Sequence, residues 1–131
     1  MYEIEKKGYG YKLTFSGSID ADEMREWVEK SKEQLASAPT EFGVFVDMRT
    51  LQPLDTDAQA SMEEGQKLYK ATGMVRSVVV VASAVVRLQF ARIARETGIY
   101  KWERYIDASS VPDWENVGVA WIIEGIDPDI D

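Results

Sequence analysis

A short stretch of the sequence holds five side chains of the types that do chemistry. They are Asp47, Arg49, Asp55, Thr56 and Asp57. Carboxylate oxygens are the ligands that Mg²⁺ prefers, so the three aspartates are candidates for a metal cluster. An arginine at the carboxyl edge of an open α/β sheet can bind an anion, and a threonine hydroxyl can accept a phosphate. The stretch is therefore the first candidate for a functional site.

Helix capping is a simpler interpretation of residues 55–57. Asp and Thr side chains accept hydrogen bonds from the free N–H groups of a first helical turn, and negative charge suits that end of the helix. Thr56 and Gln59 fit a capping box, which places the cap at Thr56. Similarly, the commoner outcome for Arg49 beside Asp47 is a surface ion pair that contributes little. We therefore expect caps, and neither a metal nor a cofactor.

The composition excludes several classes of enzyme. The chain has 131 residues, the size of one domain, and contains neither cysteine nor histidine. A Ser-His-Asp triad, a cysteine nucleophile and the usual zinc ligand sets are therefore excluded. The net charge of −8 would repel nucleic acid. We rank a carboxylate-based hydrolase last, because no combination of base, nucleophile and oxyanion donors can be assembled.

Membrane segments and export signals are not evident in the sequence. The longest apolar run, Val78 to Ala82, is far too short for a membrane span. The first residues, MYEIEKK, lack the apolar centre of a secretion signal. The sequence thus predicts a cytoplasmic protein.

Hydrophobic periodicity predicts an α/β domain over residues 1–126, followed by an acidic tail, 127–131, without structure of its own. Alternating polar and apolar residues indicate an N-terminal hairpin, and the remaining strands alternate with helices. Such alternation predicts a mixed, mainly parallel sheet with the hairpin antiparallel at one side, in the order ββαβαβαβα. The expected elements are strands from Tyr2 and at Tyr11–Phe15, a helix from Asp20 to Pro39, a strand at Phe42–Met48, a helix from Thr56 to about Ala71, a strand at Arg76–Ser83, a helix from Ser83 to Gly98, a strand at Trp102–Asp107 and a helix from Pro112.

The element order and three segments resemble the STAS domain, and more closely the SpoIIAA-like family of small stand-alone bacterial proteins. The segments are "FGVFVDMRTLQPLDTDA", "RSVVVVASAVVRLQFARIARETGI" and "VPDWENVGVAWI". STAS domains serve as anti-sigma factor antagonists and as cytoplasmic tails of sulfate transporters. The resemblance covers nearly the whole chain and implies a regulatory module without enzymatic activity.

The same resemblance gives the aspartate cluster a specific meaning. Antagonists of this family carry an Asp-Ser-Ser-Gly type motif at the start of the second helix, and a partner kinase phosphorylates its second serine. The counterpart here is Asp55-Thr56-Asp57-Ala58, so the phosphoacceptor position is Asp57. This departure argues against the usual phosphorylation switch, although Thr56 remains a possible acceptor.

Aromatic residues suggest an alternative function. Most tryptophans are expected in the core, but some of the large side chains are candidates for lining an apolar pocket between the helices and the sheet. The candidates are Trp27, Phe90, Trp114 and Trp121. The SpoIIAA-like family shares its broad architecture with lipid-binding CRAL-TRIO domains, which makes a small apolar or lipid-like ligand the second hypothesis.

The primary hypothesis is a module that docks a protein partner around the start of the second helix. Its switch residues would be the five named first, Asp47, Arg49, Asp55, Thr56 and Asp57. We also expect a homodimer, because an edge hairpin rich in aromatic and apolar residues is a natural pairing surface. The hairpin residues concerned are Tyr2, Ile4, Tyr9 and Tyr11.

Overall fold

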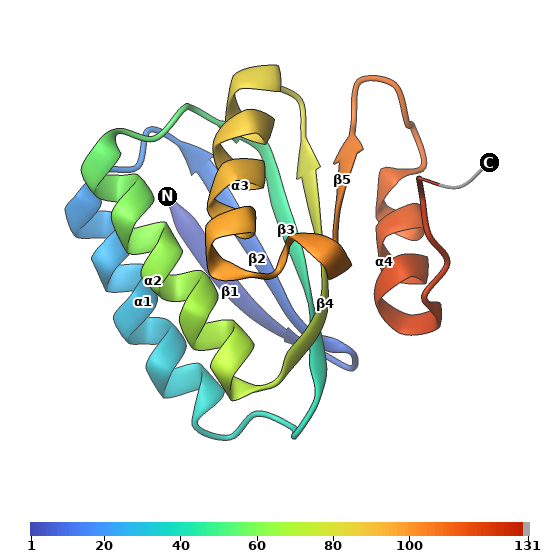
Figure 1. The fold of residues 1–131 in the computed structure, drawn as a ribbon, viewed down its shortest axis with the longest axis horizontal. Helices are drawn as coiled ribbons and strands as arrows, with labels where there is room; N and C mark the ends of the chain where they lie inside the picture. The colour runs from blue at the N-terminus through green and yellow to red at the C-terminus, as the bar shows by residue number, and fades with distance from the viewer. Residues whose placement is uncertain (130–131) are drawn as a thin grey trace.

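The computed structural model describes residues 1–129 and consists of one five-stranded sheet between two helical layers (Figure 1). Helices α1, α2 and α3 cover one face of the sheet, and α4 covers the other (Figure 1). The elements are β1 (Tyr2–Lys7), β2 (Gly10–Gly17), α1 (Ala21–Leu35), β3 (Phe42–Leu51), α2 (Thr56–Thr72), β4 (Met74–Val81), α3 (Ala84–Thr97), the 3₁₀ helix η1 (Tyr100–Trp102), β5 (Glu103–Asp107) and α4 (Trp114–Glu124).

The predicted fold class is confirmed. The strands lie in the order β1-β2-β3-β4-β5, with β1 antiparallel to β2 and all other neighbours parallel. Several boundaries differ from the prediction; β4, for example, spans Met74–Val81 rather than Arg76–Ser83, and two further differences have a physical cause. β3 continues to Leu51 because its pairing with β2 extends to Gly17. The last helix begins at Trp114 rather than Pro112, because the preceding residues form a turn in which Val111 N donates to the carbonyl of Asp107.

Each central strand contributes to two separate cores. On β3, Val44 and Val46 pack against the layer of α1, α2 and α3, whereas Phe45 packs against α4. On β4, Val79 faces the first layer and Val78 the second. Side chains alternate along a strand, so apolar residues at every position predict burial on both faces. The continuous apolar run of β4 is explained by these two cores.

Helix ends follow the capping rules at most positions. Asp20 caps α1 and accepts a hydrogen bond from Glu23 N at 2.9 Å. Ser83 caps α3 and accepts from Val86 N at 3.3 Å. Gly98 ends α3 in the left-handed conformation, which glycine adopts without steric cost. These three predicted helix boundaries are confirmed.

The aromatic residues of the first hairpin pack inward. Tyr11 is 1% exposed, and Tyr2, Ile4 and Tyr9 are half-buried against the two cores. Their number therefore does not argue for a partner surface. The expected homodimer remains a prediction, which now rests on the free backbone edge of β1, the first strand of the sheet.

The C-terminal segment returns to the sheet. Asp127 accepts hydrogen bonds from Arg104 Nε at 2.8 Å and from Arg104 Nη2 at 2.9 Å. The Arg104 guanidinium also lies 4.3 Å from the centre of the Trp121 ring. The start of the expected acidic tail is thus held against β5, while residues 130 and 131 lie outside the described part. Within residues 1–129, the helices are all too short or too polar to cross a membrane.

Close packing of α1 on α2 depends on Gly65. A Cβ at this position would collide with the Trp27 ring, which is fixed by stacking on Tyr69 at 5.6 Å and by an edge contact with Phe15 at 5.1 Å. We expect Gly65→Ala to lower the free energy of unfolding by about 1–3 kcal/mol, the usual cost of overpacking a core. Urea denaturation measures this change. Gly8→Ala is the control, because a Cβ at Gly8 has open space, and an equal loss in both variants would contradict the packing argument.

Candidate functional site

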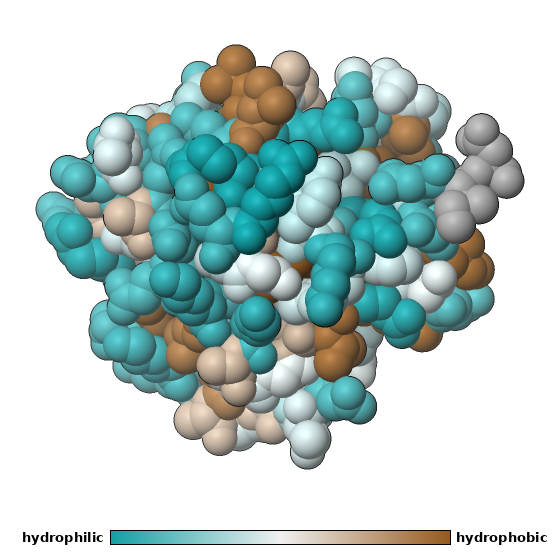
Figure 2. Space-filling view, in the orientation of Figure 1, coloured by the Kyte–Doolittle hydropathy of each residue, from teal (hydrophilic) through white to brown (hydrophobic). Residues whose placement is uncertain are grey.

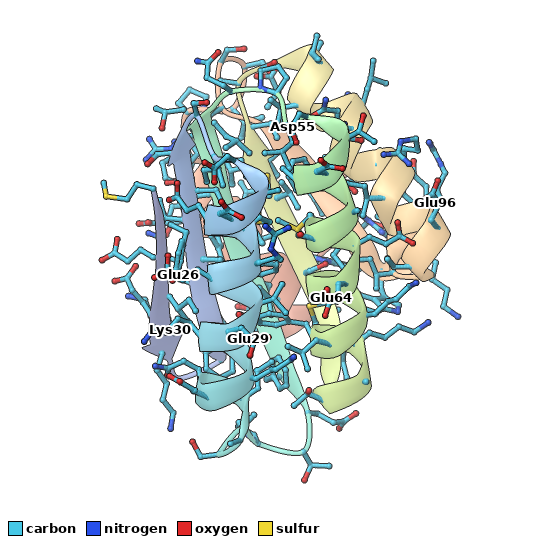
Figure 3. All side chains as sticks on the ribbon, turned by 90° about the vertical axis from the view of Figure 1, so that its left-hand side faces the viewer. Glu26, Glu29, Lys30, Asp55, Glu64 and Glu96 are labelled. Atoms are coloured by element: carbon cyan, nitrogen blue, oxygen red, sulfur yellow. The ribbon has the colours of Figure 1, made fainter. Side chains whose placement is uncertain are left out.

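The start of α2 is capped by Asp55. Its Oδ1 accepts a hydrogen bond from Ala58 N at 2.8 Å, and its backbone is extended, as an N-cap requires. Of the three candidate caps, Asp55 is therefore the one used, and the predicted capping box of Thr56 and Gln59 is wrong, because the helix begins one residue earlier than the box implied. Thr56 and Asp57 are exposed residues of the first turn. Figure 3 shows Asp55 at this end of α2.

A side chain from α3 fixes the loop before this cap. Leu54 N donates to Gln89 Oε1 at 2.9 Å, and Gln89 Nε2 donates to the Leu54 carbonyl at 3.0 Å. The same carbonyl accepts from Gln59 Nε2 at 3.0 Å, and Gln59 Oε1 accepts from Arg92. Leu54 itself is only 4% exposed. The α2 start is thus anchored to α3 through two amide side chains, of which Gln89 was missed in the sequence and Gln59 was assigned to a capping box instead.

Asp47 and Arg49 lie on the other side of the sheet. Asp47 occupies the β3 face that packs against α4, and Arg49 donates to its two carboxylate oxygens from Nε at 3.0 Å and from Nη2 at 2.9 Å. The Arg49 guanidinium lies 4.1 Å from the centre of the Trp114 ring of α4. Burial would raise the pKa of Asp47, but the hydrogen bonds and charge of Arg49 outweigh it and hold the pKa below its usual value.

The five predicted switch residues therefore form two groups. Asp55, Thr56 and Asp57 lie at the start of α2, whereas Asp47 and Arg49 form an ion pair stacked on α4. No group of three or more acidic side chains within residues 1–129 is arranged to hold a metal ion. The first group is the candidate functional site, because its carboxylate and hydroxyl face solvent on a rigidly anchored helix end.

The four predicted pocket residues are also divided by the sheet. Trp27 and Phe90 line a cavity of about 30 Å³ between the sheet and the layer of α1, α2 and α3. Trp114 and Trp121 belong to the core under α4. The four cannot line one pocket, since they lie on opposite faces. At roughly 10–15 Å³ for each water, the cavity has room for about two water molecules.

A buried carboxyl group lines this cavity and was missed in the sequence. Glu103 of β5 is 5% exposed, and its carboxyl oxygens accept hydrogen bonds from Ser77 Oγ at 2.9 Å and Tyr105 Oη at 2.6 Å. Burial raises the pKa of Glu103 to about 7, although these hydrogen bonds oppose the shift. Trp27 lines the same cavity, and its buried Nε1 has no hydrogen-bond partner within the described residues. The only sequence signal was a charged residue near the start of an expected strand.

Comparisons with known proteins identify the fold. Neither a family model nor a curated protein sequence matches the chain. A solved structure, that of the anti-sigma factor antagonist SpoIIAA in its unphosphorylated form, matches with a TM-score of 0.56 and 13% sequence identity. The match covers 88% of this chain and 96% of that one. The chain therefore has the STAS fold that the sequence resemblance implied.

The cap geometry separates the roles of the neighbouring aspartates. We expect Asp55→Ala to lower the free energy of unfolding by about 1 kcal/mol, because the Ala58 N–H loses its partner. Asp57→Ala should cost no more than a few tenths of a kcal/mol, since only an exposed interaction with the helix dipole is lost. Chemical denaturation of both variants measures the difference. A larger loss for Asp57→Ala would contradict the assignment of the cap.

The Glu103 environment predicts a pH dependence of stability. An ordinary glutamate has a pKa of 4.5, so between pH 4.5 and about 7 the unfolded chain loses the proton that folded Glu103 retains. The resulting stabilisation is complete below pH 4.5 and is lost as the pH rises through about 7. Glu103→Gln keeps an uncharged side chain of the same shape. We therefore expect its Tm, relative to the unmodified protein, to be higher at pH 8 than at pH 5.

Glu64→Gln is the control for this measurement, because the same change is made at an exposed position of α2. Its Tm difference from the unmodified protein should be the same at both pH values. A constant Tm difference for Glu103→Gln as well would show that Glu103 does not retain its proton in the folded state.

Proposed function

We propose that this chain is a non-enzymatic, STAS-like regulatory module that binds a protein partner around the start of α2. Asp57 stands at the position that is phosphorylated in antagonists of the family and supplies a permanent negative charge there. One carboxylate carries about one unit of charge, against roughly two for a phosphate, so it reproduces the phosphorylated state only in part. The module would therefore be held in one state rather than switched.

One observation carries this proposal. The helix cap is provided by Asp55, so the exposed carboxylate of Asp57 is not needed to hold the fold. Within residues 1–129 it takes part in neither the cap nor an ion pair. A charged side chain in this situation is available to a partner, and the Gln89 contacts keep the helix end in a fixed position for docking.

A small ligand between helices and sheet is a second candidate function. Trp27 and Glu103 favour it, because both residues line the same cavity and the Trp27 Nε1 has no hydrogen-bond partner among residues 1–129. The cavity of about 30 Å³ limits the ligand to a molecule of a few heavy atoms. A lipid-like ligand would require α1 and α2 to move away from the sheet, against the edge contact of Trp27 in α1 with Phe15 in β2.

The role of Asp57 is tested by the partners that the protein captures. We expect Asp57→Ser to leave the Tm nearly unchanged and to alter the set of proteins recovered from a cell extract, because a charge at the docking surface is removed. Affinity purification followed by mass spectrometry measures the set. Asp22→Ser is the matched control, since Asp22 is an exposed aspartate in the first turn of another helix, α1.

The proposal is overturned if Asp57→Ser, Asp22→Ser and the unmodified protein recover the same partners. A change shared by the two variants would assign the effect to total charge rather than to the α2 start. A change confined to Asp57→Ser supports docking at this site.

A further inference from the structure

The outer side of α3 forms a groove next to the last strand. It has a volume of about 350 Å³ and runs between α3, η1 and β5. The groove is much larger than the cavity near Glu103, which has a volume of about 30 Å³. It is lined by Ala84, Arg87, Leu88, Ala91, Arg95, Tyr100 and Tyr105.

This groove lies on a different side of α3 from the α2 start. Residues 84, 87, 88, 91 and 95 follow a helical spacing of three and four, so they form one stripe along the helix. Gln89 and Arg92, which contact the α2 region, project to another side of α3. A ligand in the groove would therefore leave the α2 start uncovered.

The groove is basic in an acidic protein. α3 carries three arginines against one glutamate, whereas the chain as a whole has a net charge of −8. Of these arginines only Arg92 forms an ion pair within the described residues, with Glu96, so Arg87 and Arg95 are free of carboxylate partners there. Acidic side chains instead project from α1 and α2, among them Glu26, Glu29 and Glu64 (Figure 3). Figure 2 shows strongly hydrophilic side chains over α3 and an apolar patch at its N-terminal end.

The side chains between the two free arginines are apolar or aromatic. Leu88 is 69% exposed, an unusual exposure for a leucine, and Tyr100 is 41% exposed. Arg95 is held in place over the Tyr100 ring, 4.4 Å from its centre, and donates to Tyr100 Oη at 3.2 Å. Asp107 lies near Arg87 without pairing to it, because the Asp107 carboxylate accepts hydrogen bonds from Ser109 N and Ser109 Oγ.

The adjacent strand offers backbone groups to a ligand. β5 is the last strand of the sheet, so one side of its backbone has no strand partner in the part of the chain that the structure describes. Extended peptides bind such edges through main-chain hydrogen bonds and place alternate side chains into neighbouring pockets. An extended peptide therefore fits a groove that is bounded on one side by β5.

We propose that the groove between α3 and β5 binds an extended acidic segment of a partner protein. Arg87 and Arg95 are eight residues apart on α3, which corresponds to about 12 Å. In an extended chain, about 13 Å separates residues i and i+4, whose side chains lie on one face together with that of residue i+2. The predicted ligand thus has the sequence pattern acidic-x-apolar-x-acidic. Its two carboxylates would pair with Arg87 and Arg95, and its apolar side chain would pack on Leu88 and Ala91.

The proposal is tested with a labelled peptide and the intact protein. The probe is fluorescein-GSTETLTETSG, and the control peptide, fluorescein-GSTEETLTTSG, has the same composition with its two glutamates adjacent. Fluorescence anisotropy measures the Kd for each. We expect the first peptide to bind at least about tenfold more tightly, since only its spacing reaches both arginines.

Charge variants on α3 locate the binding site. The double variant Arg87→Gln, Arg95→Gln should weaken binding of the first peptide by about tenfold or more, because the peptide's two carboxylates lose the arginines that bind them. Arg92→Gln is the matched control, as it makes the same change on the same helix but on the side toward α2, and it should leave the Kd nearly unchanged. All three arginines are exposed, so circular dichroism should report intact folds. Asp57→Ser should not alter peptide binding, which separates this proposal from the function proposed for α2.

Three results would overturn the proposal. The first is that the two peptides have equal Kd values. The second is that Arg92→Gln weakens peptide binding as much as the double variant does. The third is that a single-stranded oligonucleotide of matched charge binds as tightly as the first peptide. The first two results would indicate non-specific electrostatic attraction of the peptide rather than binding in the groove. The third would indicate a site that binds anions in general. Absence of peptide binding at millimolar concentration would overturn it as well.

Discussion

Burial of β3 and β4 on both faces is the constraint on which the rest of the structure depends. The central residues of these strands, Phe42–Met48 and Ser77–Val81, are buried, and alternation along the strand decides which of the two cores each side chain enters. Val44 and Val46 therefore require the layer of α1, α2 and α3, and Phe45 requires α4. The same alternation sends Asp47 to the α4 side, where Arg49 neutralises it and Trp114 covers Arg49. The position of this polar pair is thus a consequence of the sheet.

Periodicity was sufficient to predict the fold but could not predict which residues meet. Helix and strand positions follow from local patterns of apolar residues, and the caps at Asp20 and Ser83 follow from local chemistry. The grouping of Trp27 with Phe90, and of Trp114 with Trp121, depends on which face of the sheet each helix covers. Local sequence patterns do not specify which face that is. The buried Glu103 was missed for the same reason, because its donors Ser77 and Tyr105 come together only through the pairing of β4 with β5.

The identity of the N-cap of α2 decides which side chains at this helix end are left exposed. A cap at Thr56 would have occupied the hydroxyl that is the one remaining phosphoacceptor in the motif. With Asp55 as the cap, the Thr56 hydroxyl and the Asp57 carboxylate are both exposed on the first turn. Anions at this point are stabilised by the free N–H groups and the dipole of the helix. The negative charge of Asp57 therefore costs the fold little.

The two proposed surfaces share α3 but act on different sides of it. Gln89 holds the α2 start, while Arg87 and Arg95 face β5. Coupling between two ligands requires a structural element that has two arrangements, and each ligand must bind one arrangement more tightly than the other. The inner side of α3 argues against such an element, because Val86 and Ile93 are fully buried in the larger core and a shift of the helix would open cavities around them. The two surfaces should therefore bind their ligands independently, so that one copy of the chain can hold two partners at once.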